Sequence, residues 1–99
     1  MEIKVINRGS EGEFLRIGRL DSNSAPEIEE ILREQVANYD KMILNLSSLD
    51  YISSAGLRLL KILHMDMKKK HGELTIRNCN SLVMEVFEMT GFAGLLTFE

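Results

Sequence analysis

The chain has 99 residues and a formal net charge of −3; 44% of its residues are hydrophobic and 27% are charged. This length corresponds to one folded domain, so we expect a single domain over residues 1–99. No apolar run reaches the ~18–20 residues of a membrane span, the N-terminus lacks the apolar stretch of a secretory signal, and the basic field of nucleic-acid binders is absent. A lone cysteine cannot form an internal disulfide. We therefore expect a cytoplasmic protein without direct membrane insertion or a nucleic-acid partner.

The first third of the chain predicts a β-hairpin followed by a helix. Residues 2–7 and 13–19 have the pattern of two strands, joined by the Gly-rich turn at 8–12. Ser24 is the expected N-cap of the helix, Glu27 would complete a capping box, and Pro26 falls in the first turn. The core-facing positions of this helix recur at helical spacing: Ile28, Ile31, Leu32 and Val36.

The remaining chain alternates between strands and helices. We expect strands at 42–46, 73–78 and 95–98, with a connection at 47–53 and helices at about 54–70 and 82–89. Gly72 and Gly91 are placed to end the two helices, and Ser81 to cap the second one. Alternation predicts parallel neighbouring strands with right-handed crossovers. The expected fold class is α/β, a mixed sheet with an N-terminal antiparallel hairpin, parallel strands and about three to four helices.

Residues with catalytic or metal-binding chemistry do not form a recognisable set. His64 and His71 lie seven positions apart, whereas a helical metal site favours a spacing of four, so we interpret both as solvated surface histidines. Cys79 has no partner cysteine and is expected to be a buried or half-buried thiol. No glycine-rich phosphate loop is present. We expect no enzymatic activity, no metal and no cofactor.

One segment stands out, the stretch Leu-Asp-Tyr-Ile-Ser-Ser-Ala-Gly-Leu at 49–57. It follows a predicted buried strand and begins the long helix. Helix N-terminal N–H groups and the helix dipole favour negative charge there, so the fold would tolerate a phosphate on Ser54. The alternative is that Ser53 or Ser54 is only an N-cap, which would contribute about 1 kcal/mol.

This segment, Asp50 to Leu57, resembles the signature of the STAS domain, the sulphate transporter and anti-sigma factor antagonist family. The pair Leu20-Asp21 ahead of the first helix resembles a second landmark of that family. The resemblance spans essentially the whole chain and implies a STAS-like fold. Short stand-alone members are anti-sigma factor antagonists, which bind an anti-sigma factor serine kinase and are inactivated when it phosphorylates them. A PP2C-type serine phosphatase restores them.

Carried over by position, the resemblance makes Ser54 the phosphorylated residue, because it stands before Ala55-Gly56-Leu57. Many antagonists have an aspartate immediately before the acceptor, where this chain has Ser53, so Ser53 remains the alternate site. The resemblance also implies that the Asp21 carboxylate lies near the acceptor.

The long helix carries a further indication of a partner surface. Its core-facing positions are Leu57, Leu59, Leu60, Leu63 and Met67, and a different stripe begins at Ser54. That stripe, with Asp21 and Ser53, gives the expected partner-binding residues: Asp21, Ser53, Ser54, Arg58, Lys61, Ile62 and Met65. Alternatively, Ile62 and Met65 are peripheral core.

The sequence therefore predicts a phosphorylation-switched binding module that is a monomer by itself. A non-switching STAS scaffold or an accessory subunit of a signalling assembly or transporter is the alternative. A small enzyme is disfavoured by the missing chemistry.

Overall fold

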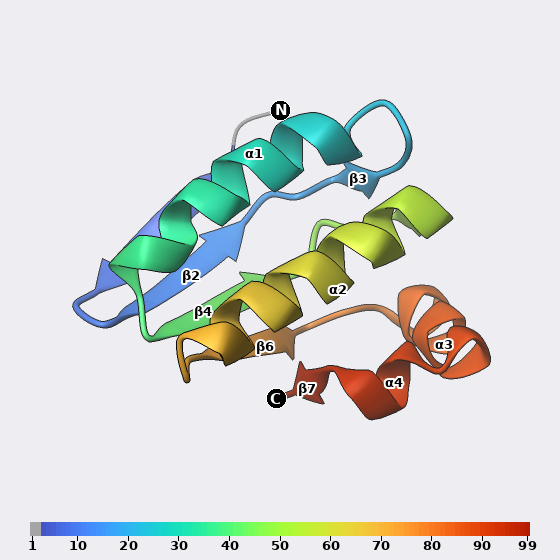
Figure 1. Ribbon diagram of the computed structural model, residues 1–99. Helices are drawn as coiled ribbons and strands as arrows, with labels where there is room; N and C mark the ends of the chain where they lie inside the picture. Colours follow the sequence, from blue (N-terminus) through green and yellow to red (C-terminus); the bar gives the residue numbers. More distant parts are fainter. Residues whose placement is uncertain (1–2) are drawn as a thin grey trace.

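The computed structural model describes residues 3–99, which form a five-stranded sheet, a separate two-stranded ribbon and four α-helices (Figure 1). The large sheet has the strand order β1-β2-β4-β6-β7, and the ribbon pairs β3 with β5. The strands are β1 Lys4–Arg8, β2 Glu11–Leu15, β3 Arg19–Leu20, β4 Lys41–Asn45, β5 Tyr51–Ile52, β6 Glu73–Arg77 and β7 Thr97–Phe98. The helices are α1 Ala25–Gln35, the 3-10 turn η1 Val36–Asn38, α2 Ser54–Lys69, α3 Ser81–Thr90 and α4 Phe92–Leu95.

The predicted mixed sheet is confirmed. Strands β1 and β2 pair in antiparallel fashion, with Lys4 opposite Leu15 and Arg8 opposite Glu11. The pairs β2–β4, β4–β6 and β6–β7 are all parallel, as alternation with helices requires. The predicted first strand began at residue 2, and its first position lies outside the described residues.

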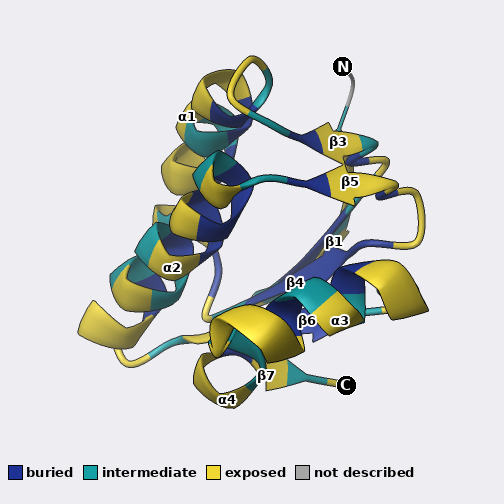
Figure 2. Cartoon of the chain, turned by 90° about the vertical axis from the view of Figure 1, so that its right-hand side faces the viewer, coloured by how far each residue is buried: buried dark blue, intermediate teal, exposed yellow. Residues whose placement is uncertain are grey.

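The hydrophobic core lies between the large sheet and the layer formed by α1 and α2 (Figures 1 and 2). All five predicted core positions of α2 are buried: Leu57, Leu59, Leu60, Leu63 and Met67. Helix α1 buries Ile28 and Leu32 fully, whereas Ile31 and Val36 lie half-buried at the margin. Helical periodicity therefore predicted which face of each helix meets the sheet.

The prediction of one continuous strand over 13–19 is wrong. Strand β2 ends at Leu15, and Arg16 adopts a left-handed backbone with φ 68°. This turn redirects the chain so that β3 leaves the large sheet and pairs in parallel with β5. Figure 2 shows the resulting ribbon as a further wall of the core, next to the N-terminal ends of α1 and α2. The connection expected at 47–53 contains β5, which the sequence analysis did not predict.

Helix starts also differ from the expected caps. Ser24 has helical backbone angles, and its hydroxyl donates to the carbonyl of Arg19 instead of accepting a first-turn N–H, so no capping box forms. Helix α3 is capped by the side chain of Asn80, which accepts from the N–H of Val83 at 2.8 Å, and not by Ser81. Helix α1 therefore has no capping side chain, whereas α3 is capped one residue earlier than expected.

Of the two glycines expected to end helices, one has the left-handed backbone conformation typical of a helix end. Gly91 has φ 82° at the end of α3, as predicted. After α2, His71 takes the left-handed conformation with φ 62°, and Gly72 does not. Gly72 instead permits close packing, because an added Cβ would lie 2.8 Å from the carbonyl oxygen of Asp40. Directly after Gly91 the chain forms the short helix α4, whose last residue, Leu95, was expected to begin the final strand.

The face of the sheet opposite α1 and α2 carries an ion-pair network centred on Glu13. The Glu13 side chain is only 5% exposed. It accepts hydrogen bonds from Arg8 at 2.8 Å, Asn45 at 2.9 Å and Arg77 at 3.1 Å. These three donors satisfy a buried carboxylate that would otherwise be costly to remove from water.

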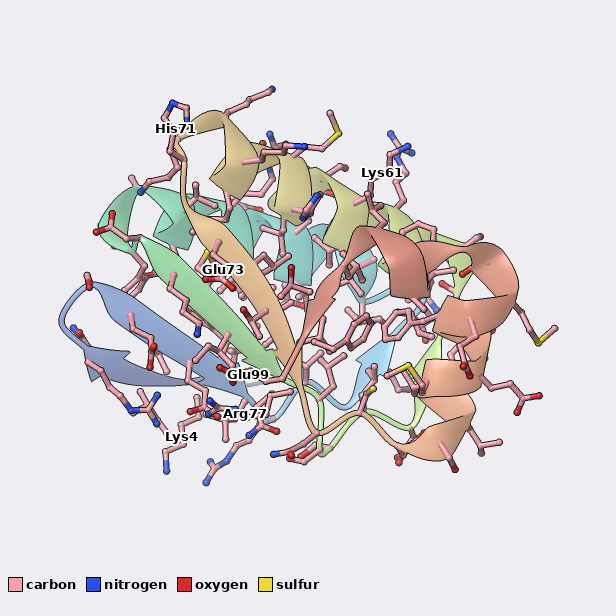
Figure 3. All side chains as sticks on the ribbon, turned by 90° about the horizontal axis from the view of Figure 1, so that it is seen from below. Lys4, Lys61, His71, Glu73, Arg77 and Glu99 are labelled. Carbon is pink, nitrogen blue, oxygen red and sulfur yellow. The ribbon has the colours of Figure 1, made fainter. Side chains whose placement is uncertain are left out.

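Glu99 extends the network across the sheet. Its carboxylate accepts from Arg77 at 2.9 Å and from Lys41 at 3.1 Å, and Figure 3 shows Arg77 and Glu99 close together on this side of the molecule. Beneath these charges, Ile43 is 0% and Thr75 1% exposed. Charged side chains thus shield this face of the sheet without a helix.

We expect Glu13 to make the stability of the protein sensitive to acid. The hydrogen bond from Asn45, followed by the hydrogen bond from Arg8 and the positive charge of Arg77, holds the pKa of the Glu13 carboxyl below its usual value. The stabilisation is present above the unfolded pKa of about 4.3 and is lost as the pH falls through the folded value. Urea unfolding at a series of pH values should show a smaller acid-induced loss in Glu13→Gln than in the wild type. Glu88→Gln, an exposed site on α3, is the matched control; an unchanged pH dependence in Glu13→Gln would contradict the prediction.

Candidate functional site

The two adjacent serines have different structural roles at the start of α2. Ser53 is the N-cap, half-buried, and its hydroxyl oxygen accepts from the N–H of Gly56 at 3.4 Å. Ser54 is the first helical residue, and it is exposed. Among the side-chain hydrogen bonds of the described residues, none involves the Ser54 hydroxyl. Ser54 therefore presents its hydroxyl to solvent at the positive end of the α2 dipole.

Close packing holds the ribbon against this helix start. The N–H of Ser53 donates to the carbonyl of Leu20 at 2.7 Å, which ties β3 to the residue before α2. A Cβ on Gly56 would lie 2.6 Å from the Leu20 Cβ and 2.8 Å from Ile52 Cγ1. Only glycine allows the ribbon and the first turn of α2 to approach so closely. This contact places the loop that follows Leu20 beside the serines.

Asp21 organises that loop. One carboxylate oxygen accepts from the N–H groups of Asn23 and Ser24, each at 2.9 Å, and the other accepts from Arg19 at 3.1 Å. The bond from the Ser24 N–H is the main reason that the pKa of Asp21 falls to about 2, with Arg19 next. Asp21 is therefore an anion over the whole physiological range, and its oxygens are engaged by its own loop. No hydrogen bond joins Asp21 to Ser54 among the described residues.

We expect Asp21→Ala to loosen this loop selectively. Without an acceptor, the amide hydrogens of Asn23 and Ser24 should exchange with solvent roughly two- to tenfold faster, the effect of losing one net hydrogen bond. Asp21→Asn keeps one acceptor oxygen and should have a smaller effect. Hydrogen exchange measured by NMR tests this, with Asp50→Ala as the control at an exposed carboxylate. Unchanged exchange at both amides in Asp21→Ala would contradict the assigned role.

A hollow of about 290 Å³ lies between the N-terminal turns of α1 and α2. Its wall contains one acidic and one basic side chain, Glu29 and Arg58, among small residues. The complete lining is Ser22, Ala25, Pro26, Glu29, Ala55 and Arg58. Of these, the sequence analysis singled out only Arg58 as a site residue. Nothing in the linear pattern indicated that the two helix starts meet.

The predicted stripe on α2 lies at the surface of the protein. Arg58 and Lys61 are exposed, Met65 is 48% exposed and Ile62 is half-buried. These residues follow Ser54 along the outer side of the helix, away from the buried leucines. Met65 is therefore not core, and Ile62 lies at the border. The structure thus places Ser54, Arg58, Lys61 and Met65 on one continuous outer face.

The ribbon adds two surface features that the sequence analysis did not predict. The guanidinium of Arg19 lies 4.9 Å from the ring centroid of Tyr51, a cation–π contact on the exposed side of the ribbon. On the other side of β5 is a mainly apolar hollow of about 200 Å³, lined by Asp50, Tyr51, Ile52, Leu82, Val83 and Val86. Leu82 is 69% exposed there. Both features adjoin the segment that leads to Ser54.

Other candidate chemistry is dispersed in the described part of the chain. Residues 3–99 contain no group of three or more histidine, cysteine or acidic side chains placed to hold a metal ion. His64 is half-buried on α2, and His71 is exposed in the turn after it. Burial raises the pKa of the half-buried Cys79 thiol. Within the same residues, every helix is too short or too polar to span a bilayer.

Comparison with known proteins supports the resemblance seen in the sequence. The model of the STAS domain matches residues 13–99. A Bordetella bronchiseptica protein named "Putative anti-sigma factor antagonist BtrV" is 37% identical over 79 residues, which cover 79% of this chain and 68% of that protein.

Solved structures share the fold. The phosphorylated form of the Bacillus cell fate determinant SpoIIAA superposes with a TM-score of 0.75 at 15% identity, covering 99% of this chain and 91% of that one. A STAS domain protein from Planctomyces limnophilus, described as an anti-sigma-factor antagonist, gives 0.86 at 14% identity, covering 98% and 87%. The family model matches most of this chain, and the Bordetella relative is 37% identical to it. The chain therefore belongs to the STAS domain family.

Proposed function

We propose that this chain is an anti-sigma factor antagonist, a protein-binding module inactivated by phosphorylation at Ser54. The observation that carries the proposal is the exposed hydroxyl of Ser54 at the N-terminus of α2, beside a neighbouring serine that is engaged as the cap. A kinase needs an accessible hydroxyl, and Ser54 offers one where Ser53 is half-buried. The name of the relative BtrV supports the antagonist part of the proposal.

The proposed partners are an anti-sigma factor serine kinase, which the unmodified chain binds so that the sigma factor is released, and a PP2C-type serine phosphatase, which restores the chain. The structure of SpoIIAA in a phosphorylated form supports the idea that this fold accommodates such a modification. We place the protein in the cytoplasm and assign it no catalytic activity of its own.

The partner surface would consist of the outer face of α2 with the adjoining loop. Ser54, Arg58, Lys61 and Met65 provide a mixed basic and apolar strip, and the Asp21 loop borders it. The hollow between the helix starts, which includes Arg58, provides a concave feature for a partner side chain. Rigid positioning by the glycine contact at Gly56 keeps this surface preorganised.

Phosphorylation would act on binding rather than on folding. A phosphoserine adds about −1.5 to −2 charges and three acceptor oxygens. First-turn N–H groups and Arg58, one turn further along α2, can stabilise this charge in the free protein. A partner surface shaped for a neutral hydroxyl would have to desolvate the same dianion, which is unfavourable.

Affinity capture from a lysate of the source organism tests the proposal. Wild type, Ser54→Ala and Ser54→Asp are used as baits, with Ser10→Asp as a charge-matched control in the β1–β2 turn. A serine kinase captured by wild type, Ser54→Ala and Ser10→Asp but not by Ser54→Asp would support the switch. Scaffold or transporter subunits captured equally by all four baits would favour a fixed STAS scaffold instead.

A further inference from the structure

The layer formed by α1 and α2 separates charge by helix. The outer side of α1 presents an acidic ridge, which we define as Glu27, Glu30 and Glu34. The outer side of α2 presents a basic ridge, which we define as Arg58, Lys61, Lys68 and Lys69. All seven side chains are exposed. Figure 1 shows the two helices side by side in front of the sheet, so the ridges lie next to each other on one face.

These seven charged side chains form no ion pair within residues 3–99. Among the ion pairs of the described residues, none includes a member of either ridge. Between the facing sides of the two helices, Arg33 pairs with Asp66 at 2.9 Å. On the opposite face of the sheet, by contrast, Arg8, Lys41 and Arg77 all have carboxylate partners. The helix layer thus carries two complementary rows without internal partners.

We propose that two copies of this chain associate through their helix layers, with the acidic ridge of each copy against the basic ridge of the other. Helices α1 and α2 both connect parallel strands, so they run in the same direction. A two-fold axis parallel to the helices and lying between them places α1 over α2 of the second copy. A two-fold axis perpendicular to the helices would set like-charged ridges together. The charge pattern therefore selects one symmetric arrangement.

The ridges are also matched along the helix axes. Glu29 and Arg58 line the same hollow, and Arg33 bonds to Asp66, which fixes the relative height of the two helices. In the two-fold arrangement Glu30 of one copy then lies near Lys61 of the other. Met65, 48% exposed, falls within the contact and adds apolar area. The acidic ridge makes a second copy a better occupant than an anionic membrane or a nucleic acid, which it would repel.

The expected association is weak. At ~1.5 Å per residue, α1 is about 16 Å and α2 about 24 Å long, so two such helices offer on the order of 400 Å² per copy. Stable interfaces bury about 800 Å² per partner. The dimer should therefore form only at high protein concentration, and at lower concentration the chain should be a monomer, as expected from the sequence.

One consequence rests on the proposed function. The dimer would cover Ser54 at the end of the basic ridge, so self-association and kinase binding would be mutually exclusive. The self-association itself does not depend on a kinase and is measured on the purified protein alone, so the two proposals can fail separately.

The test reverses one charge on either ridge and then mixes the two variants. Self-association is measured by sedimentation equilibrium up to ~1 mM protein. Lys61→Glu and Glu30→Lys should each weaken self-association at least about tenfold, because a symmetric interface contains every substitution twice. An equal mixture of the two variants should regain association as a heterodimer, since both symmetry-related contacts then join opposite charges. Raising the salt concentration from about 0.1 to about 1 M should weaken the wild-type dimer, as the Debye length falls from ~10 to ~3 Å.

Lys4→Glu and Glu88→Lys are the matched controls and should behave as wild type. Figure 3 shows Lys4 far from Lys61, on the other side of the molecule. A wild-type protein that remains monomeric at ~1 mM overturns the proposal and would indicate that the two ridges bind a different protein. So does a dimer that is indifferent to Lys61→Glu, or a mixture of variants that fails to associate.

Discussion

Replacing Ser54 by aspartate is expected to lower the affinity of the chain for the proposed anti-sigma factor kinase by roughly two to three orders of magnitude, while the fold survives. The physical reason is that a charge at this position gains helix N–H groups and Arg58 in the free protein but must be desolvated in the complex. A loss of about 3–4 kcal/mol gives this change in affinity, because each ~1.4 kcal/mol is a factor of ten. Isothermal titration with the purified kinase measures it.

Two variants control this experiment. Ser54→Ala should bind with wild-type affinity, because the hydroxyl has no side-chain hydrogen bond among the described residues. Ser10→Asp adds the same charge in the turn before β2, at the end of the molecule remote from the start of α2 (Figure 1). Equal affinities of wild type and Ser54→Asp would exclude a switch at this residue.

Replacing Gly56 by alanine should destabilise the protein by about 1–3 kcal/mol, although alanine is the better helix former. The added Cβ would lie 2.6 Å from Leu20 Cβ and 2.9 Å from the Leu20 carbonyl oxygen, which is backbone and cannot move alone. Relief requires the β3–β5 ribbon to separate from the start of α2. Because this contact positions the Asp21 loop beside Ser54, kinase binding should weaken as well.

Gly94→Ala is the matched control for urea unfolding. Gly94 also lies in a helix, α4, and nothing is within 4 Å of its added Cβ. The control should therefore be neutral or slightly stabilising. If Gly56→Ala were as stable as Gly94→Ala, the close approach of ribbon and helix would not be the constraint described here.

Local patterns were sufficient to predict most of the architecture. Helical spacing of leucines gave the buried face of α2, and the alternation of strands with helices gave the parallel connections. These patterns are predictive because each reflects how a single helix or strand turns its apolar side toward the core. The cap of α3, by contrast, depends on where the chain enters the helix, and Asn80 also donates to the carbonyl of Leu49, a contact between distant segments.

The ribbon was beyond sequence prediction for a related reason. Strands β3 and β5 have two residues each, too few to show a period, and they exist because Arg16 turns the chain out of the large sheet. Left-handed backbone is uncommon for residues other than glycine, so an arginine at position 16 did not indicate a turn.

The candidate site was predicted in part. The resemblance to the STAS family indicated Ser54 and Asp21, and periodicity indicated Arg58, Lys61 and Met65. The hollow was not predicted, because Pro26 and Ala55 meet only in the folded chain. The different roles of Ser53 and Ser54 likewise depend on a single backbone step, in which Ser53 is extended and Ser54 is helical.

Phosphopeptide mapping after incubation with the purified kinase and ATP tests the central claim most directly. The account predicts phosphate on Ser54 in the wild type, no incorporation in Ser54→Ala, and normal incorporation in Ser54 of a Ser53→Ala variant, which loses only the cap. Phosphate on Ser53, or an unmodified 49–57 segment under conditions in which the kinase is active, would contradict it.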